Sequence, residues 1–499
     1  MSLAALLSGA LLAAASLPSP LGPLAFVGLA PLLRALVAAP PLRQALWAGC
    51  LTGLVCFGVG FGWVLGSEVG GGLSPWLVYA LAVPALSLGT GLFAACVAWI
   101  ARRSPALALA AAPGLWVAIE FARAQDWLLA VPWNHLGYAI ADRPLLVQGA
   151  SVFGLYGLSA WIVAVNAGLV GIRRLPAAAR LGLAAALAAP LALGLPLLGA
   201  DDPAAGADRL RVGAVQPAIQ EGRRHVPARH QENLRQLLDL SEPFVSERAD
   251  LVVWPESAWE RTLGASGDAF LAAIAHHLAT PLVTGAWRAP TSARPGWRNT
   301  AVLATSDGRT RVVAEKVYPV QLYERAPAGP AARLLARAGL WSGRFAPGHA
   351  SEPLVLQRAG GAPVRIGVLV CIDASHPEVA RASRAAGAQL LLAISNEAGS
   401  GAWSAALHAR AARVRAVENR VPVVRVANTG PTLWIDARGR VLAELAPGEA
   451  ASAVHAVALA EAPLARPRPG DRSVAASCFL SALAMAAARF ARACRGVES

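Results

Sequence analysis

Three residues that could cooperate in covalent catalysis each lie at the end of a predicted β-strand. Glu256 follows the run Leu-Val-Val-Trp-Pro, Lys316 follows the second strand of a predicted hairpin, and Cys371 follows the run Ile-Gly-Val-Leu-Val. A nucleophilic cysteine needs a base to take its proton and a cation or amide donors to stabilise the oxyanion. A carboxylate, an ammonium and a thiol meet these needs together, so the three residues are candidates for one nucleophilic site.

Residue usage singles out two of these positions. Lys316 is the only lysine among the 44 basic residues. A surviving lysine suggests a position that needs a compact ammonium, which guanidinium cannot supply, although drift could also leave one lysine. Cys371 is the only cysteine of the predicted globular region, and the other five lie in or beside apolar segments. A lone cysteine there is a candidate nucleophile, although a cysteine at a strand end is often only packed in a core.

The histidines offer a rival arrangement. His376 follows Cys371 by five residues and His408 lies further on, so either could form a Cys–His dyad. That dyad would leave Lys316 and Glu256 unexplained, and we favour the three-residue set. Nine histidines show no spacing typical of metal ligands, so we expect no metal.

An α/β domain must position these residues, because short β-rich runs alternate with alanine-rich helical runs between residues 201 and 473. This alternation is typical of a domain in which helices cover buried sheets. Asp307-Gly308 joins two more strands as a hairpin. The predicted strands are 211–215, 251–254, 281–285, 364–371 and 390–395, and the predicted helices are 229–247, 267–278, 377–387 and 404–419.

The N-terminal two-fifths of the chain has the composition of a membrane domain. Residues 1–199 carry four acidic residues and nine arginines, whereas the rest carries 26 acidic and 35 basic residues. Only 15% of the whole chain is charged, against roughly 25% in globular proteins, which excludes an ordinary soluble enzyme. Apolar runs near membrane-spanning length predict helices at 3–17, 21–38, 45–66, 75–101, 105–122, 150–172, 179–199 and 474–493.

Loop charge predicts the orientation of these eight helices. With the N-terminus inside, seven of the nine arginines lie in cytoplasmic loops and only Arg123 and Arg143 lie outside. This distribution fits the positive-inside rule. The domain at 201–473 then faces outward, which in a bacterial cell is the periplasm.

Two further charge features need an interpretation. The net charge of +14 does not indicate nucleic-acid binding, because the arginines are scattered and no DNA-reading motif is present. Glu120 lies near a predicted helix end and has two open interpretations. It is either a functional intramembrane carboxylate or an ion-pair partner of Arg123, three residues on.

The set Glu256, Lys316 and Cys371 resembles the Glu-Lys-Cys triad of the nitrilase superfamily. A nitrilase domain behind a multi-helix membrane region is similar to one family, the apolipoprotein N-acyltransferases. Motifs in the membrane part extend the resemblance over almost the whole chain and make it specific. They are Leu115-Trp116 with Glu120, Pro132-Trp133-Asn134-His135-Leu136-Gly137-Tyr138, Gly154-Leu155-Tyr156-Gly157-Leu158-Ser159 and Val165-Asn166-Ala167.

The resemblance implies a role for each site residue. Glu256 would be the general base and Cys371 the nucleophile that accepts the acyl group. Lys316 would stabilise the tetrahedral oxyanion, together with the backbone N–H of Ile372. Glu324, eight residues after Lys316, matches a second family glutamate that orients the lysine or accepts a proton.

The resemblance also implies the reaction and its partners. Cys371 would take a fatty acyl chain from a phospholipid, and the α-amine of an S-diacylglyceryl-cysteine at the N-terminus of an apolipoprotein would then attack the thioester. No cofactor is needed for this chemistry. We expect a monomeric bacterial inner-membrane enzyme with membrane helices in 1–200, a periplasmic αββα sandwich in 201–473 and a last helix with a basic tail in 474–499.

The chain departs from the family pattern at three places. Ile372-Asp373 stands where the family usually has Tyr-Glu, which keeps the charge and loses the tyrosine. Glu397-Ala398-Gly399 replaces Asp-Ala-Trp, and 220–225 has no counterpart of a family lid tryptophan. Three rivals therefore stay open: a membrane-tethered amidase, an N-acyltransferase for another amine, and a transporter or scaffold with an inert domain.

Overall fold

The chain folds into two compact units, and each is described by itself. One consists of residues 1–65, 74–197 and 468–499, and the other is built mainly from 198–467. The computed structural model describes residues 1–67, 74–125, 130–172, 177–199, 208–224, 226–321, 323–325, 337, 344–349, 352–358, 361–461, 474–476, 478–479 and 483.

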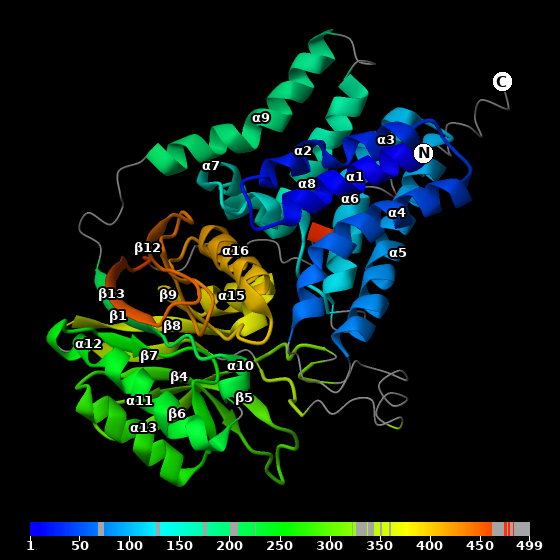
Figure 1. Ribbon diagram of the computed structural model, residues 1–499. Helices are drawn as coiled ribbons and strands as arrows, with labels where there is room; N and C mark the ends of the chain where they lie inside the picture. The colour runs from blue at the N-terminus through cyan, green and yellow to red at the C-terminus, as the bar shows by residue number, and fades with distance from the viewer. Residues whose placement is uncertain are drawn as a thin grey trace, which may run out of the picture. The chain divides into compact units, whose positions relative to one another are not determined.

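The first unit is helical (Figure 1). Its elements are α1 (Ser2–Ser16), η1 (Gly22–Leu24), α2 (Ala25–Gly28), α3 (Ala30–Leu36), α4 (Leu42–Gly60), η2 (Gly62–Gly66), α5 (Pro75–Ala101), α6 (Pro105–Ala124), η3 (Leu136–Ile140), α7 (Pro144–Val147), α8 (Ala150–Gly171) and α9 (Ala177–Gly199). Within the described residues, α4, α5, α6 and α8 are long and apolar enough to cross a membrane. Of the predicted helix 474–493, only 474–476, 478–479 and 483 are described, and they are helical.

The segment predicted as one helix over 21–38 is broken into η1, α2 and α3. Prolines in the first turns of η1 and α3 explain these starts, because proline lacks the N–H that a helix interior needs. At the break before α3, Asn166 of α8 accepts hydrogen bonds from the backbone N–H groups of Leu29 and Ala30, at 2.8 and 2.9 Å. A side chain from a distant helix thus satisfies the backbone groups that the break releases.

Glu120 and Arg123 both bind the loop that follows α6. The Glu120 carboxylate accepts hydrogen bonds from the Trp116 indole at 2.9 Å and from the backbone N–H of Leu136 at 2.6 Å. The Arg123 guanidinium donates to the carbonyl of Trp133 at 2.7 Å. These contacts hold the Pro-Trp-Asn-His-Leu-Gly-Tyr segment against the helix.

The second unit contains two mixed sheets. The first has the order β13-β1-β2-β4-β5-β6, with β3 paired to β4, and the second has the order β12-β11-β10-β9-β8-β7. The strands are β1 (Arg209–Gln216), β2 (Leu251–Val253), β3 (Trp259–Leu263), β4 (Leu282–Arg288), β5 (Arg298–Ala304), β6 (Thr310–Glu315), β7 (Leu354–Arg358), β8 (Gly361–Val370), β9 (Leu390–Ser395), β10 (Val423–Ala427), β11 (Thr432–Ile435), β12 (Val441–Leu445) and β13 (Ala451–Ala458).

Helices cover the outer face of each sheet (Figure 1). Leu237 and Leu271 bring α11 and α13 against the first sheet, and Val379 and Ala412 bring α15 and α16 against the second. The helices and 3₁₀ turns of this unit are α10 (Glu221–Arg224), η5 (Pro227–Arg229), α11 (His230–Ser241), α12 (Pro243–Ser246), α13 (Ala265–His277), η6 (Cys371–Ser375), α15 (Pro377–Ala385) and α16 (Gly401–Asn419).

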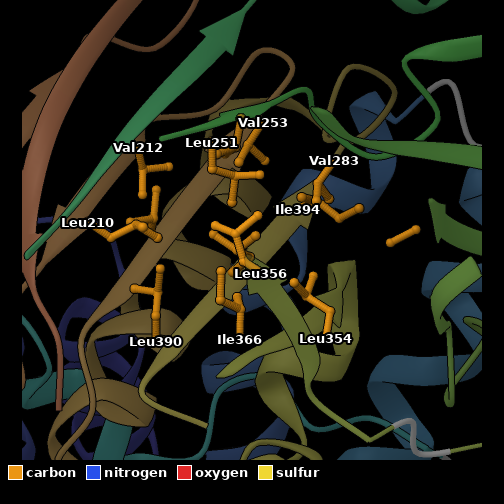
Figure 2. Close-up of a cluster of buried hydrophobic side chains, with 14 of the residues drawn as sticks. Leu210, Val212, Leu251, Val253, Val283, Leu354, Leu356, Ile366, Leu390 and Ile394 are labelled. Carbon is orange, nitrogen blue, oxygen red and sulfur yellow. The ribbon is translucent and has the colours of Figure 1, made fainter. Parts of the chain in front are cut away.

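The two sheets pack face to face through a buried aliphatic cluster (Figure 2). Leu210 and Leu251 of the first sheet and Ile366 and Leu390 of the second belong to it. Residues alternate between this layer and the outer ones, as the side-chain period of a strand requires. β9 is buried on both faces, which explains why its sequence is a continuous apolar run. The layers are therefore helix, sheet, sheet and helix.

Candidate active site

Strand directions bring the candidate residues to one edge of each sheet. β2 and β4 are parallel, and β5 is antiparallel to both β4 and β6, so β2 and β6 end where β5 begins. Glu256 follows β2, Lys316 follows β6, and Asn299 is the second residue of β5. In the other sheet β8, β9 and β10 are parallel, so Cys371 lies at the same edge as the ends of β9 and β10.

Lys316 lies between two carboxylates. Its Nζ donates to Glu256 Oε1 at 3.0 Å and to Glu324 Oε1 at 2.9 Å. The side chain of Lys316 is 2% exposed, that of Glu256 5% and that of Glu324 9%. Two carboxylates around one ammonium leave this group with one negative charge in excess, in a setting where water screens little.

Asn299 completes this group, and the sequence analysis missed it. Its Nδ2 donates to Glu256 Oε1 at 2.7 Å and to Glu324 Oε1 at 3.4 Å. The amide therefore bridges the two carboxylates beside Lys316. Its one sequence signal is a polar residue at the start of the first hairpin strand.

Backbone amides hold the outer oxygens of both carboxylates. The N–H of Asn396, directly after β9, donates to Glu256 Oε2 at 2.9 Å. The N–H of Val320 donates to Glu324 Oε2 at 2.7 Å. Glu256 is therefore fixed by three donors from three different segments, which is how a catalytic base is held in one geometry.

Cys371 is the first residue after β8, which ends at Val370, one residue before the predicted strand end. Its φ is +56°, in the left-handed region that non-glycine residues rarely adopt. Such backbone strain persists where the surroundings fix it and is frequent at functional sites. Ile372 follows in η6, and its side chain is buried.

The charges around Cys371 keep its proton in place until a base removes it. Burial, together with the Glu256 carboxylate, raises the pKa of the Cys371 thiol well above its usual value. Burial also acts to raise the pKa of Glu256, but the Lys316 ammonium and the hydrogen bonds outweigh it and lower that pKa below its usual value. At neutral pH the group therefore pairs a thiol with an ionised carboxylate, the states that general-base activation of a nucleophile requires.

The Lys316 ammonium stays charged. Burial acts against the charge, but Cys371 and the two carboxylates outweigh burial and raise the pKa of Lys316 well above its usual value. A permanent cation at this place suits the stabilisation of an oxyanion.

Asp373 positions the segment that carries Lys316. Its carboxylate accepts from the backbone N–H of Val317 at 3.1 Å and from that of Tyr318 at 3.0 Å. Burial raises the pKa of Asp373 to about 6. The side chain thus ties η6, which begins at Cys371, to the chain directly after the lysine.

The two histidines of the rival dyad are engaged with other groups. His376 stacks on Tyr318, with ring centroids 3.7 Å apart, and its Nδ1 lies 3.6 Å from Glu378. His408 Nδ1 lies 3.6 Å from Glu397, and burial lowers the pKa of His408 to about 4. Within the described parts of the chain, no group of three or more His, Cys, Asp or Glu side chains could hold a metal ion.

The fold and the geometry of the site together indicate the class of protein to which the α/β unit belongs. A carboxylate, a lysine and a cysteine meet at one edge of a four-layer sandwich, and the carbon–nitrogen hydrolase family model matches residues 211–466. A second model, for the N-terminal domain of apolipoprotein N-acyltransferase, matches residues 8–168. An amidase of the nitrilase superfamily from Nesterenkonia AN1 is similar over 50% of this chain and 90% of its own, with TM-score 0.38 and 23% identity.

Curated relatives match both units at once. An apolipoprotein N-acyltransferase of Geobacter metallireducens is 32% identical over 88% of this chain and 86% of its own length. Another, of Azotobacter vinelandii, is 34% identical over 89% of this chain and 86% of its own. The chain belongs to the apolipoprotein N-acyltransferase family.

Proposed function

We propose that this acyltransferase moves a fatty acyl chain from a phospholipid to the α-amine of an apolipoprotein's N-terminal S-diacylglyceryl-cysteine, through a thioester on Cys371. The observation that carries the proposal is the buried group of Glu256, Lys316 and Glu324 at an edge of the first sheet, beside Cys371 at the end of β8 in the second sheet. Membership of the family supports the lipid donor and the lipoprotein acceptor.

In the first half-reaction Glu256 takes the proton of the Cys371 thiol as sulfur attacks the carbonyl carbon of the phospholipid's acyl ester. The oxyanion of the tetrahedral intermediate is stabilised by the Lys316 ammonium and the backbone N–H of Ile372. Collapse breaks the ester C–O bond, and the proton on Glu256 passes to the departing oxygen. The products are a lysophospholipid and an acylated Cys371.

In the second half-reaction the neutral α-amine attacks the thioester carbonyl. Glu256 accepts a proton from the amine, the C–S bond breaks, and sulfur takes the proton back as the amide forms. The same base and the same oxyanion donors therefore serve both halves, as microscopic reversibility favours.

Glu324 and Asp373 act through Lys316. Glu324 accepts from the same ammonium as Glu256, and Asp373 holds the backbone of the two residues after the lysine. Both are positioning residues, because the carboxylate that is hydrogen-bonded to the Cys371 thiol is that of Glu256.

The same proposal places the protein in the bacterial inner membrane as a monomer. The four long apolar helices support membrane insertion. The positive-inside distribution of arginine supports eight spanning helices, in 1–200 and 474–499, and a periplasmic catalytic domain at 201–473.

Intact-protein mass spectrometry tests the proposal. The purified enzyme is incubated with phospholipid and then with a diacylated lipopeptide. We expect a mass gain of one acyl chain on Cys371, removed when the lipopeptide's amine is added. Cys371→Ala should abolish the adduct, whereas Cys96→Ala, at an exposed cysteine of the helical unit, should leave it unchanged. An adduct that only water discharges would indicate an amidase, and normal turnover of Cys371→Ala would overturn the mechanism.

A further inference from the structure

A second buried charge pair lies directly beside the segment that holds the catalytic base. Glu397 follows Asn396 in sequence, and its Oε1 accepts from Arg425 Nη2 of β10 at 2.5 Å. Both side chains are 1% exposed. The mechanism above uses neither residue.

The turn after β9 connects this pair to Glu256. Asn396 gives its backbone N–H to Glu256 Oε2 at 2.9 Å, and its side-chain oxygen accepts from Asn428 Nδ2 at 2.9 Å. The carbonyl of Glu397 accepts from the N–H groups of Ser400 and Gly401, both at 3.0 Å, which closes the turn into α16. The placement of the Asn396 N–H therefore depends on where Glu397 is held.

Arg425 connects Glu397 to a second loop. Its guanidinium also donates to the carbonyl of Pro431, so it cross-links β9's end to the loop between β10 and β11. Gly430 leaves no space beside the pair, because a Cβ there would lie 3.1 Å from Glu397 Oε2 and 3.2 Å from Arg425 Nη2.

Charge balance gives Arg425 a second effect. Glu256, Glu324 and Lys316 already carry one net negative charge, and Asp373 binds the backbone directly after Lys316. Glu397 adds another carboxylate close enough to oppose ionisation of Cys371. His408, the other basic side chain beside Glu397, is neutral at pH 7, so Arg425 supplies the compensating charge.

We propose that Glu397 and Arg425 are a positioning pair for the acyl transfer, which fixes the Asn396 N–H on Glu256 and compensates the charge of the Glu397 carboxylate near Cys371. The inference rests on the proposed function, because it assigns the pair to the same thiol and base. Neither residue touches the reacting atoms, and both act through Asn396 and through charge.

The test follows Cys371 as a function of pH in the full-length enzyme in detergent micelles. The first measurement is single-turnover acylation by phospholipid between pH 5.5 and 9.5. The second is alkylation of Cys371 by iodoacetamide, resolved by peptide mass spectrometry. The variants are Arg425→Met, Arg425→Lys, Glu397→Gln and the double Glu397→Gln/Arg425→Met.

Arg425→Met should slow acylation at neutral pH about 10-fold or more and move the rising limb of both profiles about one unit to higher pH, because it leaves Glu397 uncompensated. Glu397→Gln should move the limb to lower pH. The double variant should return the limb to its wild-type position, and Arg425→Lys should restore most of the rate. A role in folding alone would lower the active fraction without moving the limb.

Arg415→Met is the matched control. Arg415 and Glu418 form another buried ion pair, on α16, with 3.0 Å between Nη1 and Oε2. Breaking that pair should lower the melting temperature without moving the limb. If Arg425→Met does not fold, the Glu397→Gln variant tests the proposal alone, because its rising limb should still move to lower pH.

Two failures are distinguishable. Limbs that stay in place in both single variants, or that move in the same direction, would overturn this inference while wild-type acylation stands. Absence of a wild-type acyl-enzyme would overturn the proposed function, and the alkylation profiles would still show whether the pair sets the state of Cys371.

Discussion

Both units bury charged side chains, and they use them differently. In the helical unit the hydrogen bonds of Glu120 and Arg123 go to neutral groups, since Glu120 accepts from an indole and a backbone amide and Arg123 donates to a backbone carbonyl. These two opposite charges lie one turn apart on α6 and attract each other without a direct hydrogen bond among the described contacts. In the α/β unit the charges bind one another, as Lys316 does with Glu256 and Glu324.

This difference suggests two roles for buried charge. The charges of the helical unit hold a loop in place, whereas those of the α/β unit prepare a thiol for reaction. In the helical unit the hydrogen bonds of Glu120 and Arg123 connect α6 to the loop that follows it. A lysine between two carboxylates, next to a thiol, gives a group whose proton positions depend on one another. Perturbed titration of this kind is typical of functional sites, so the comparison predicts where substitution should affect rate and where it should affect stability.

The largest expected effect is that of Lys316→Arg. The planar guanidinium cannot occupy the place of an ammonium that donates to two carboxylates about 3 Å away on either side. We expect acyl-enzyme formation to fall on the order of 1,000-fold, similar to the loss of an oxyanion donor. Rates by quench and mass spectrometry check this, and near-normal turnover would make the single lysine an accident of composition.

Asp373→Asn should change how stability depends on pH. Because the pKa of Asp373 is raised to about 6 in the folded protein, the folded state holds this proton more tightly than the unfolded state. The stabilisation is complete below about pH 4 and is lost as the pH rises through 6, by up to about 3 kcal/mol. The melting temperature of the wild type relative to Asp373→Asn should therefore fall between pH 4 and 7. A constant or rising difference would contradict the burial argument.

Asn299→Ala should have a smaller effect on rate. The variant removes the amide that bridges Glu256 and Glu324 and leaves the lysine contacts in place. We expect a loss of roughly 10- to 100-fold in acylation, because a hydrogen bond to a charged group contributes about 1.5–3 kcal/mol. Asn299→Asp is the informative companion, since a third carboxylate should be worse than alanine. Equal rates for wild type and alanine would remove Asn299 from the site.

The sequence predicted the parts of the site that depend on local pattern. β9 is a continuous apolar run, Glu256 and Cys371 follow mostly apolar runs, and Lys316 follows the second strand of the hairpin that Asp307-Gly308 predicts, so their elements could be inferred without a structure. Asn299 could not, because an asparagine has no distinctive chemistry until β5 is paired between β4 and β6. Strands β3, β7 and β10 to β13 were not among the predicted strands, and β12 is exposed or half-buried throughout although four of its five residues are apolar.

The helical unit shows the same limit. Residues 21–38 are apolar enough to predict one helix, yet the chain breaks before α3, where a proline lies in the first turn and Asn166, more than 130 residues away, accepts the released backbone N–H groups. The proline is visible within the segment, but the distant acceptor that satisfies the break is not. Hydrogen bonds between distant segments therefore account for two differences from the prediction. One is the missed Asn299 in the site, and the other is the break in the helix predicted over 21–38.

The smallest effect on catalysis is expected from Glu120→Gln. Its carboxylate joins Trp116 to the backbone of Leu136, so the substitution weakens two hydrogen bonds that hold a loop and should destabilise the helical unit by about 1–2 kcal/mol. Trp116→Phe is the matched control, because it removes one donor and keeps a ring against Phe93. Both variants should lower the melting temperature and change acylation of Cys371 less than about threefold, since neither touches the charges that set the thiol's proton. A loss of activity in Glu120→Gln alone, at unchanged melting temperature, would instead make Glu120 a functional carboxylate and end the distinction between the two units.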